Sequence, residues 1–224
     1  MALTLTNLGT ATATSTPAQT FNRTLVPADN SVVYYCVHAR HSSLPGTPTA
    51  SDTSGATWTN VANRGSGVIR TVIFRAKFSG TSPGSLTVTV DWGASVNTCA
   101  QGAIEALGAN LTTPEVGSAV TGTGTSTGPN VGTLSALAAG GNGRILVVGH
   151  ARGTADQTPE AGWTERFDVA AGGGAMGMCA AVLVGEDTTP TYTLGSSVAW
   201  NALAIEVAEA VAAAPDPFVT VQFR

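Results

Sequence analysis

Charge is scarce in this sequence: Asp, Glu, Lys and Arg make up 11% of its 224 residues, and the formal net charge is −4. This is less than half of the share that is usual in soluble domains. Lys and Arg occur singly, so the chain lacks the basic patch with which proteins bind a nucleic-acid backbone. We therefore expect a largely neutral, hydroxyl-rich surface and no nucleic-acid partner.

Long apolar runs are also lacking, because glycine or a charged residue interrupts each of them. A membrane-spanning helix needs about 20 consecutive apolar residues, so we expect no membrane partner. The first residues lack the basic and apolar parts of a signal peptide, which predicts no export by that route. The three cysteines, Cys36, Cys99 and Cys179, lie far apart in apolar runs, which favours buried free thiols over disulfides.

Much of the sequence occurs twice in the same order. Val-His-Ala-Arg at residues 37–40 is matched by Gly-His-Ala-Arg at 149–152, which aligns His38 with His150. Farther along, Trp58 is matched by Trp163, and Ala-Ile-Glu at 103–105 by the same tripeptide at 204–206. The second copy is shorter, chiefly opposite residues 42–53, as loops permit. The pattern predicts one domain over residues 1–210, with repeat halves 1–110 and 111–210.

Short segments rich in β-branched and aromatic residues, separated by Gly, Pro, Ser and Thr, predict an all-β chain. Two alanine-rich segments could form helices by composition, but their β-branched residues and their place at the end of each half favour strands. The Gly/Thr-rich segment 122–128 lacks the Lys-Ser/Thr ending of a phosphate loop and predicts a flexible loop. The expected strands are 3–8, 21–26, 31–40, 68–78, 86–92, 97–107, 116–121, 131–137, 144–152, 163–169, 175–186, 191–194 and 198–207.

The expected fold is a two-sheet jelly-roll-like β-sandwich with pseudo-twofold symmetry. A jelly roll consists of two Greek keys, so a unit copied once can supply each half. Residues 211–224 lie outside the repeat, and Pro215 and Pro217 tether a segment, 218–224, that alternates like a strand. Such a segment can add to the edge of a neighbouring subunit, or it can be the last edge strand of its own sheet.

No group of residues predicts a catalytic, cofactor-binding or metal-binding site. Cys36, His38 and His41 have a spacing that could suggest a metal site, but the repeat aligns Cys36 with an apolar residue. Glu105 and Glu206 are the one pair of carboxylates that the repeat singles out, and pseudo-twofold symmetry would carry them apart. No Gly-x-Ser-x-Gly turn surrounds a serine.

The paired tryptophans have two interpretations. Aromatic rings on the surface of a lectin stack on sugar rings, whereas a tryptophan present in both copies of a unit more often fills the core. We expect Trp58 and Trp163 to be core residues. Tyr34 and Tyr35 are neighbours on one strand and are expected to face opposite ways.

The doubled Thr/Gly/Ala-rich unit, the Trp-Thr pairs, the Asp-Trp-Gly step at 91–93 and the Ala-Ile-Glu strand resemble jelly-roll virion proteins of tailed bacteriophages, which decorate heads or attach to tails and fibres. The resemblance covers most of residues 1–210, and no functional residue can be carried over. It implies a non-enzymatic, self-assembling virion protein, commonly a homotrimer, that folds in the bacterial host cytoplasm and docks on the major capsid protein or a tail protein.

We therefore expect a capsid decoration or cement protein. Its predicted docking residues are Phe218, Val219, Val221 and Phe223. The first alternative is a carbohydrate-binding adhesin module of a tail or fibre, which would make a glycan the partner. The second alternative is a small β-sandwich hydrolase or lyase that acts on polysaccharide through Glu105 or Glu206.

Overall fold

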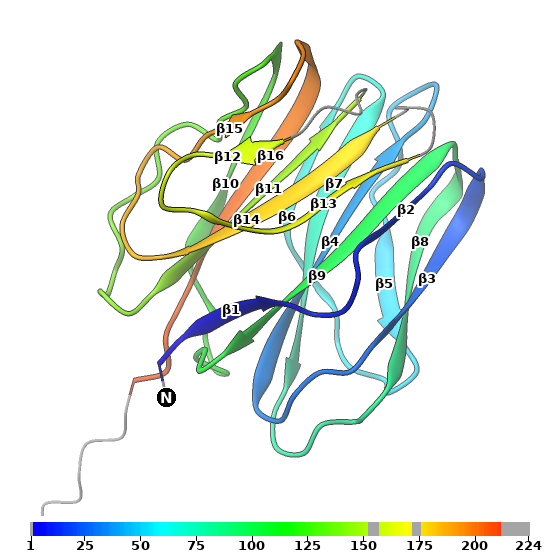
Figure 1. Ribbon diagram of the computed structural model, residues 1–224. Helices are drawn as coiled ribbons and strands as arrows, with labels where there is room; N and C mark the ends of the chain where they lie inside the picture. Colours follow the sequence, from blue (N-terminus) through cyan, green and yellow to red (C-terminus); the bar gives the residue numbers. More distant parts are fainter. Residues whose placement is uncertain (1, 152–156, 172–175, 212–224) are drawn as a thin grey trace, which may run out of the picture.

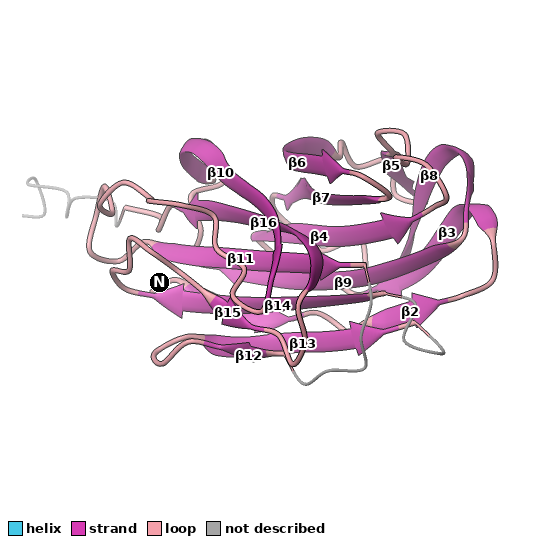
Figure 2. Cartoon of the chain, turned by 90° about the horizontal axis from the view of Figure 1, so that it is seen from above, coloured by secondary structure: helices cyan, strands magenta, loops and turns pink. Residues whose placement is uncertain are grey.

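The computed structural model describes residues 2–151, 157–171 and 176–211 (Figure 1). Within these residues the regular structure consists of antiparallel strands, and no helix occurs (Figure 2). No helix there is long and apolar enough to cross a membrane. The all-β class predicted from the sequence is confirmed, including strands over both alanine-rich segments.

Two large sheets form the middle of the molecule. The first has the order β1 (Thr4–Asn7), β9 (Thr98–Leu107), β4 (Ser31–Arg40), β7 (Ile69–Phe78) and β6 (Thr59–Ser66), and β2 (Thr12–Thr14) also pairs with β9. The second has the order β10 (Glu115–Ser126), β16 (Val198–Val207), β11 (Gly143–His150), β14 (Gly177–Val184) and β13 (Thr164–Ala170).

Two small sheets cover the outer faces. One consists of β3 (Ala18–Leu25), β8 (Leu86–Val96) and β5 (Thr49–Asp52), and the other of β12 (Thr158–Pro159) and β15 (Tyr192–Thr193). The sequence predicts two sheets, and the structure has four. The reason is that both faces of the large sheets are apolar: β4 is buried from Ser31 to Ala39, so it needs cover on both sides.

Three apolar clusters follow from this layering. The largest lies between the two large sheets and contains Tyr34, Ile104 and Leu203. A second lies between the first large sheet and β3, β8 and β5, and contains Tyr35. A third lies on the outer face of the second large sheet. Tyr34 and Tyr35 therefore face opposite ways, as expected.

The two large sheets follow the same path. Counted along the chain, the order of the five main strands in each sheet is first, fifth, second, fourth, third. The edge strands share an irregularity, because the register shifts between Asn60 and Ala62 in β6 and between Glu165 and Phe167 in β13. The packing is also reciprocal: β6 lies against β10, and β13 lies against β1 and β2.

The predicted alignment of His38 with His150 is wrong by one residue. Glu105 pairs with Val33 and Glu206 pairs with Arg144, so when the two Ala-Ile-Glu segments are superposed, His38 falls opposite Gly149. Side chains alternate along a strand, and a slip of one residue moves each of them to the other face. His38 accordingly faces the second large sheet, whereas His150 points outward against Gly177.

The predicted loop over residues 122–128 is also wrong, because β10 continues to Ser126. Two of its glycines, Gly122 and Gly124, are required by close packing. A Cβ atom on Gly124 would lie 2.7 Å from the ring of Trp200, and one on Gly122 would overlap the carbonyl oxygen of Asn130. Conversely, residues 131–137 form no strand, and only Asn130 makes an isolated bridge, to Thr191.

Candidate functional site

The two glutamates singled out by the repeat hold loops in place. Glu105 Oε1 accepts a hydrogen bond from the Ala28 backbone N–H at 2.6 Å. Glu206 Oε1 accepts one from the Ala138 N–H at 3.0 Å and one from Asn142 Nδ2 at 2.6 Å. Both loops precede a central strand, β4 or β11. Each glutamate follows an isoleucine of the cluster between the sheets, so the two side chains point to opposite outer faces and do not form a pair.

The cysteines are buried free thiols, as the sequence predicts. Burial raises the pKa of Cys36 and of Cys99 to about 12, and it raises the pKa of Cys179 as well. The thiolate is the nucleophilic form of cysteine. These side chains are therefore apolar packing groups at neutral pH.

His38 is a buried, neutral imidazole. Its Nδ1 lies 2.8 Å from Thr71 Oγ1 and its Nε2 lies 3.3 Å from the His150 carbonyl oxygen. Burial, and next the neighbouring His150, lower the pKa of His38 to about 3. His41 lies on the surface beside Ser43, so the structure does not bring it to Cys36 and His38. Among the described residues, no three His, Cys, Asp or Glu side chains are placed to hold a metal ion.

The paired tryptophans pack inward and are tied to carboxylates. Trp163 is buried, and its indole N–H donates to Asp187 at 2.7 Å. Trp58 is partly buried against Tyr35, and its N–H donates to Asp52 at 2.8 Å. Burial alone would raise the pKa of Asp52, but the hydrogen bonds from Ser54 and Trp58 outweigh it and lower that pKa.

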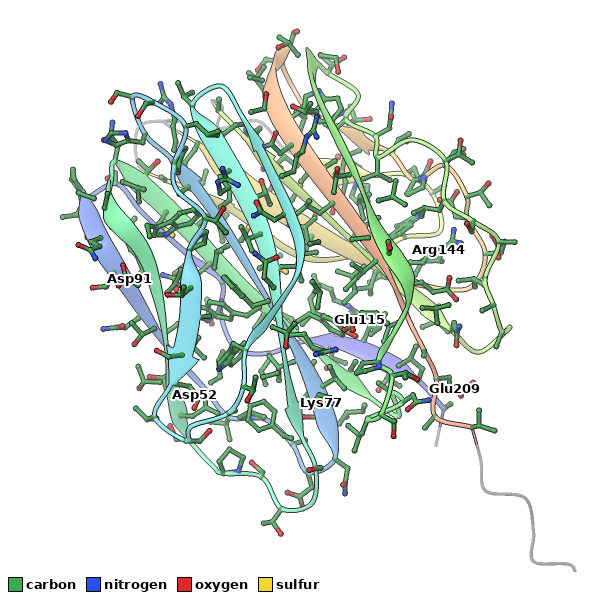
Figure 3. The ribbon with its side chains drawn as sticks, turned by 180° about the vertical axis from the view of Figure 1, so that it is seen from behind. Asp52, Lys77, Asp91, Glu115, Arg144 and Glu209 are labelled. Atoms are coloured by element: carbon green, nitrogen blue, oxygen red, sulfur yellow. The ribbon has the colours of Figure 1, made fainter. Side chains whose placement is uncertain are left out.

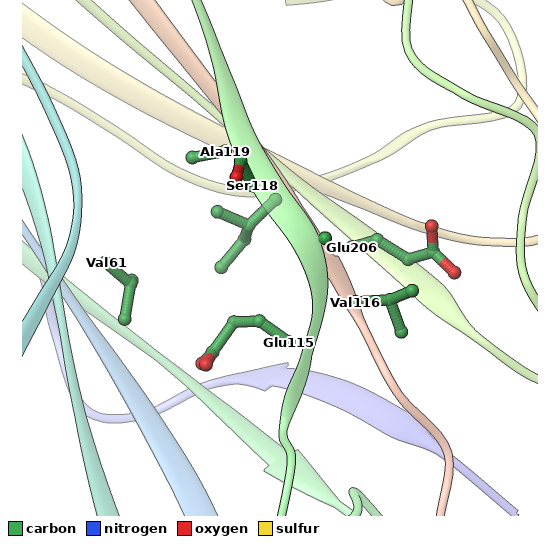
Figure 4. Close-up of a pocket in the computed structure, with 8 residues that line it drawn as sticks. Val61, Glu115, Val116, Ser118, Ala119 and Glu206 are labelled. Carbon is green, nitrogen blue, oxygen red and sulfur yellow. The ribbon is translucent and has the colours of Figure 1, made fainter.

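A shift in the register of β10 between Val116 and Val120 accompanies two small pockets. One, of about 280 Å³, lies beside Val61 of β6 and is lined by Glu115 (Figure 4). The other, of about 310 Å³, is lined by Arg144 and Glu206. The charged groups in both pockets interact with other residues. Glu115 forms an ion pair with Arg75 at 2.7 Å, and Arg144 donates a hydrogen bond to the Ser135 carbonyl and forms an ion pair with Glu186.

A larger pocket, of about 680 Å³, lies at one end of the molecule, where the last described residues leave the body. We call it the terminal groove. Its walls are mainly apolar, and they come from the turn before β4, the end of β9 and the end of the described chain. The lining residues are Asp29, Asn30, Leu107, Gly108, Ala109, Asn110, Leu111, Ala210 and Val211.

Charge is spread thinly over the rest of the molecule. The acidic and basic side chains labelled in Figure 3 lie apart from one another over both halves. Glu209 is the one beside the point where the described chain ends. The predicted docking residues Phe218, Val219, Val221 and Phe223 lie outside the described residues.

Sequence reasoning missed the terminal groove. It is formed by three segments that are far apart in the chain, and none of them carries a motif. The one available signal was the position of Val211, directly after the repeat. Comparison with known proteins adds no relative: no protein-family model, no curated protein and no solved structure matches this chain.

Proposed function

We propose that this chain is a structural protein of a tailed-bacteriophage virion, which decorates the capsid and catalyses no reaction. The observation that carries the proposal is the use of its carboxylates. Glu105 and Glu206 each fix the loop before a central strand, and Asp52 and Asp187 each fix a tryptophan. Because these carboxylates hold loops and tryptophans in place instead of facing a substrate, they stiffen the body. A stiff body suits a cement protein, which reinforces a shell.

We infer that this body arose by internal duplication and that each half is itself a jelly-roll unit, whereas the sequence predicts a single jelly roll built from both halves. The identical strand orders, the matching register shifts in β6 and β13, and the reciprocal packing of edge strands all support a pseudo-twofold relation. If β1 and β2 count as one strand, the first half has the order first, eighth, third, sixth, fifth in its large sheet and second, seventh, fourth in its small one. Strands from opposite ends of the unit thus lie side by side, as they do in a jelly roll.

In this proposal the body is built in the host cytoplasm, and the final segment joins it to a partner on the particle. The partner would be the major capsid protein, or a tail protein if the chain attaches to the tail. Phe218, Val219, Val221 and Phe223 supply apolar side chains for that contact, on a segment that the prolines separate from the body. A homotrimer is the expected form.

Removal of residues 214–224 tests this assignment. The shortened chain should fold as the full chain does, because it keeps every strand that the structure describes, but its incorporation into particles should fall. Particle-bound protein after sedimentation measures the effect, and circular dichroism with thermal unfolding checks the fold. Unchanged incorporation would show that residues 214–224 are not needed for docking on the particle.

A carbohydrate-binding module is the second candidate, and Trp58 favours it. Its ring is only partly buried, and it packs against Tyr35 of the second apolar cluster. Aromatic rings in such positions can stack on sugars. Binding to a glycan array that Trp58→Ala abolishes, while Trp163→Phe leaves it intact, would support this function over decoration.

A further inference from the structure

The terminal groove is an open surface with mainly apolar walls. Leu107 and Leu111 are only partly buried in it, and Val211 is 89% exposed. Exposed large apolar side chains are few elsewhere among the described residues: Val26, Leu44 and Val184. Those three lie in separate parts of the chain, whereas the groove gathers several apolar side chains in one place. Such a gathering marks a site of association.

The groove is held in a fixed shape. The Ala210 N–H donates to the Gly108 carbonyl at 2.8 Å, and the Asn110 N–H donates to the Ala208 carbonyl at 2.8 Å. Glu209 continues the anchoring, because its N–H donates to Asn142 Oδ1 at 2.9 Å and its Oε1 accepts the Leu3 N–H at 3.3 Å. A site that is already ordered loses little conformational entropy when it binds a ligand.

The sequence contains a segment that suits this groove. Val219, Val221 and Phe223 alternate with polar residues, so in an extended conformation they occupy one face. Three apolar side chains on one edge of an extended segment match a groove whose walls are Leu, Ala and Val. No charged residue lies between residues 218 and 223.

Residues 218–223 are better placed to bind the groove of a second copy than the groove of their own copy. Proline fixes its own backbone and restricts the residue before it to extended conformations. Pro215 and Pro217 therefore favour an extended path over residues 214–217, which spans about 13 Å. A return to its own groove would need the chain to reverse between Val211, which itself forms one wall, and residue 218.

We propose that residues 218–223 of one copy bind the terminal groove of a second copy. The contact joins two different surfaces, so repeating it builds a closed ring when the rotation allows closure, as in a trimer. The proposal rests on the proposed function and revises one part of it: the final segment joins one copy to the next, and the oligomer built in this way docks on the particle. It concerns the free protein in solution, so it can be tested without particles.

Two variants of the full chain test the groove and the segment one at a time. Val211→Glu places a charge in the groove, at a side chain that is already exposed and so contributes little to folding. Val221→Glu places the same charge on the apolar face of the segment. Matched controls are Val26→Glu, at an exposed valine outside the groove, and Thr220→Glu, on the opposite face of the segment.

Light scattering after size exclusion, over a range of concentrations, measures the oligomer. We expect the full chain and both controls to associate, and each groove or segment variant to raise the dissociation constant at least about tenfold. A mixture of Val211→Glu and Val221→Glu chains should form a one-to-one dimer, because each retains the side that the other has lost. A full chain that stays monomeric overturns the proposal, and so does a mixture that does not pair.

This test is distinct from the test of the virion assignment. Sedimentation with particles, done on the same variants, reads out docking on the shell. If Val211→Glu is monomeric but still binds particles, self-association is confirmed and the virion role stands. If the chain associates as proposed but never binds particles, the virion assignment fails alone.

Discussion

Single residues decide how closely the two large sheets approach each other. Gly149 of β11 has no side chain, and His38 of the facing sheet fills the space that a Cβ atom would take. In return, Gly102 of β9 makes room for the ring of Phe167. Each sheet thus has a glycine that makes room for a large side chain of the other sheet. The amino-acid composition does not predict such pairs.

Gly149→Ala is expected to destabilise the protein by about 1–3 kcal/mol, because the added methyl group overlaps the His38 ring in a fully packed interior. Glycine to alanine within a strand is otherwise mildly stabilising, so the sign is informative. Urea unfolding measures the change. Gly128→Ala, where a Cβ would meet open space, is the control, and equal effects at the two sites would contradict the packing described.

His38 also makes stability depend on pH. Its folded-state pKa of about 3 lies below the value of 6.5 for an unperturbed histidine, so the unfolded chain binds the proton more tightly. The contribution of His38 is fully present above pH 6.5 and is lost as the pH falls toward 3, by up to about 1.4 kcal/mol per pH unit.

His38→Gln removes this titration. We expect the stability of the wild-type protein to fall more steeply than that of the variant between pH 6 and 4, as measured by urea unfolding at each pH. The carboxylates titrate in both proteins and cancel in the comparison. Parallel curves over this range would show that His38 is not the buried neutral group described.

At the scale of elements, the sequence predicts a strand correctly where burial of that strand requires a run of apolar residues. The segments 31–40 and 198–207 are rich in apolar residues and appear with the predicted bounds as β4 and β16. β6 was missed because it is a polar edge strand, Thr-Asn-Val-Ala-Asn-Arg-Gly-Ser, whose backbone pairing is set by β7. The later part of β10 was predicted to be a loop because of its glycines. Gly124 and Gly122 are required by contacts with Trp200 and Asn130, and only the tertiary structure brings those residues near.

β10 gives a prediction in which local preference and packing disagree. Valine favours strands and glycine does not, yet Gly124→Val should destabilise the protein by at least about 2 kcal/mol because its side chain meets the Trp200 ring. Thr125→Val, at the next, exposed position of the same strand, should change little. Thermal unfolding compares the two. A stabilised Gly124→Val variant would mean that these residues form the flexible loop after all.

At the scale of the molecule, the two halves share their largest apolar cluster. Polar contacts cross the same boundary: Arg75 pairs with Glu115, and the buried Asn201 donates to the backbone carbonyls of Arg64 and Ile69. The halves are therefore expected to depend on each other for stability. The terminal groove is a product of the same arrangement, since both halves contribute walls, and so no analysis of one segment could have found it.

The shared cluster predicts one cooperative unfolding transition for the whole chain. Leu203→Ala, at a fully buried member of that cluster, should cost about 2–5 kcal/mol and lower the single transition without splitting it. Differential scanning calorimetry measures both. Two separate transitions, with only the later half of the chain affected by Leu203→Ala, would mean that the halves are independent domains.

The central claim, that this is a structural component of a virion, is tested most directly by the protein composition of purified particles. Quantitative mass spectrometry of virions from the phage that encodes the chain should find it in a fixed ratio to the major capsid protein or a tail protein, after washing that removes loosely bound material. Peptides of the chain that are abundant in the lysate but absent from the washed virions would contradict the account.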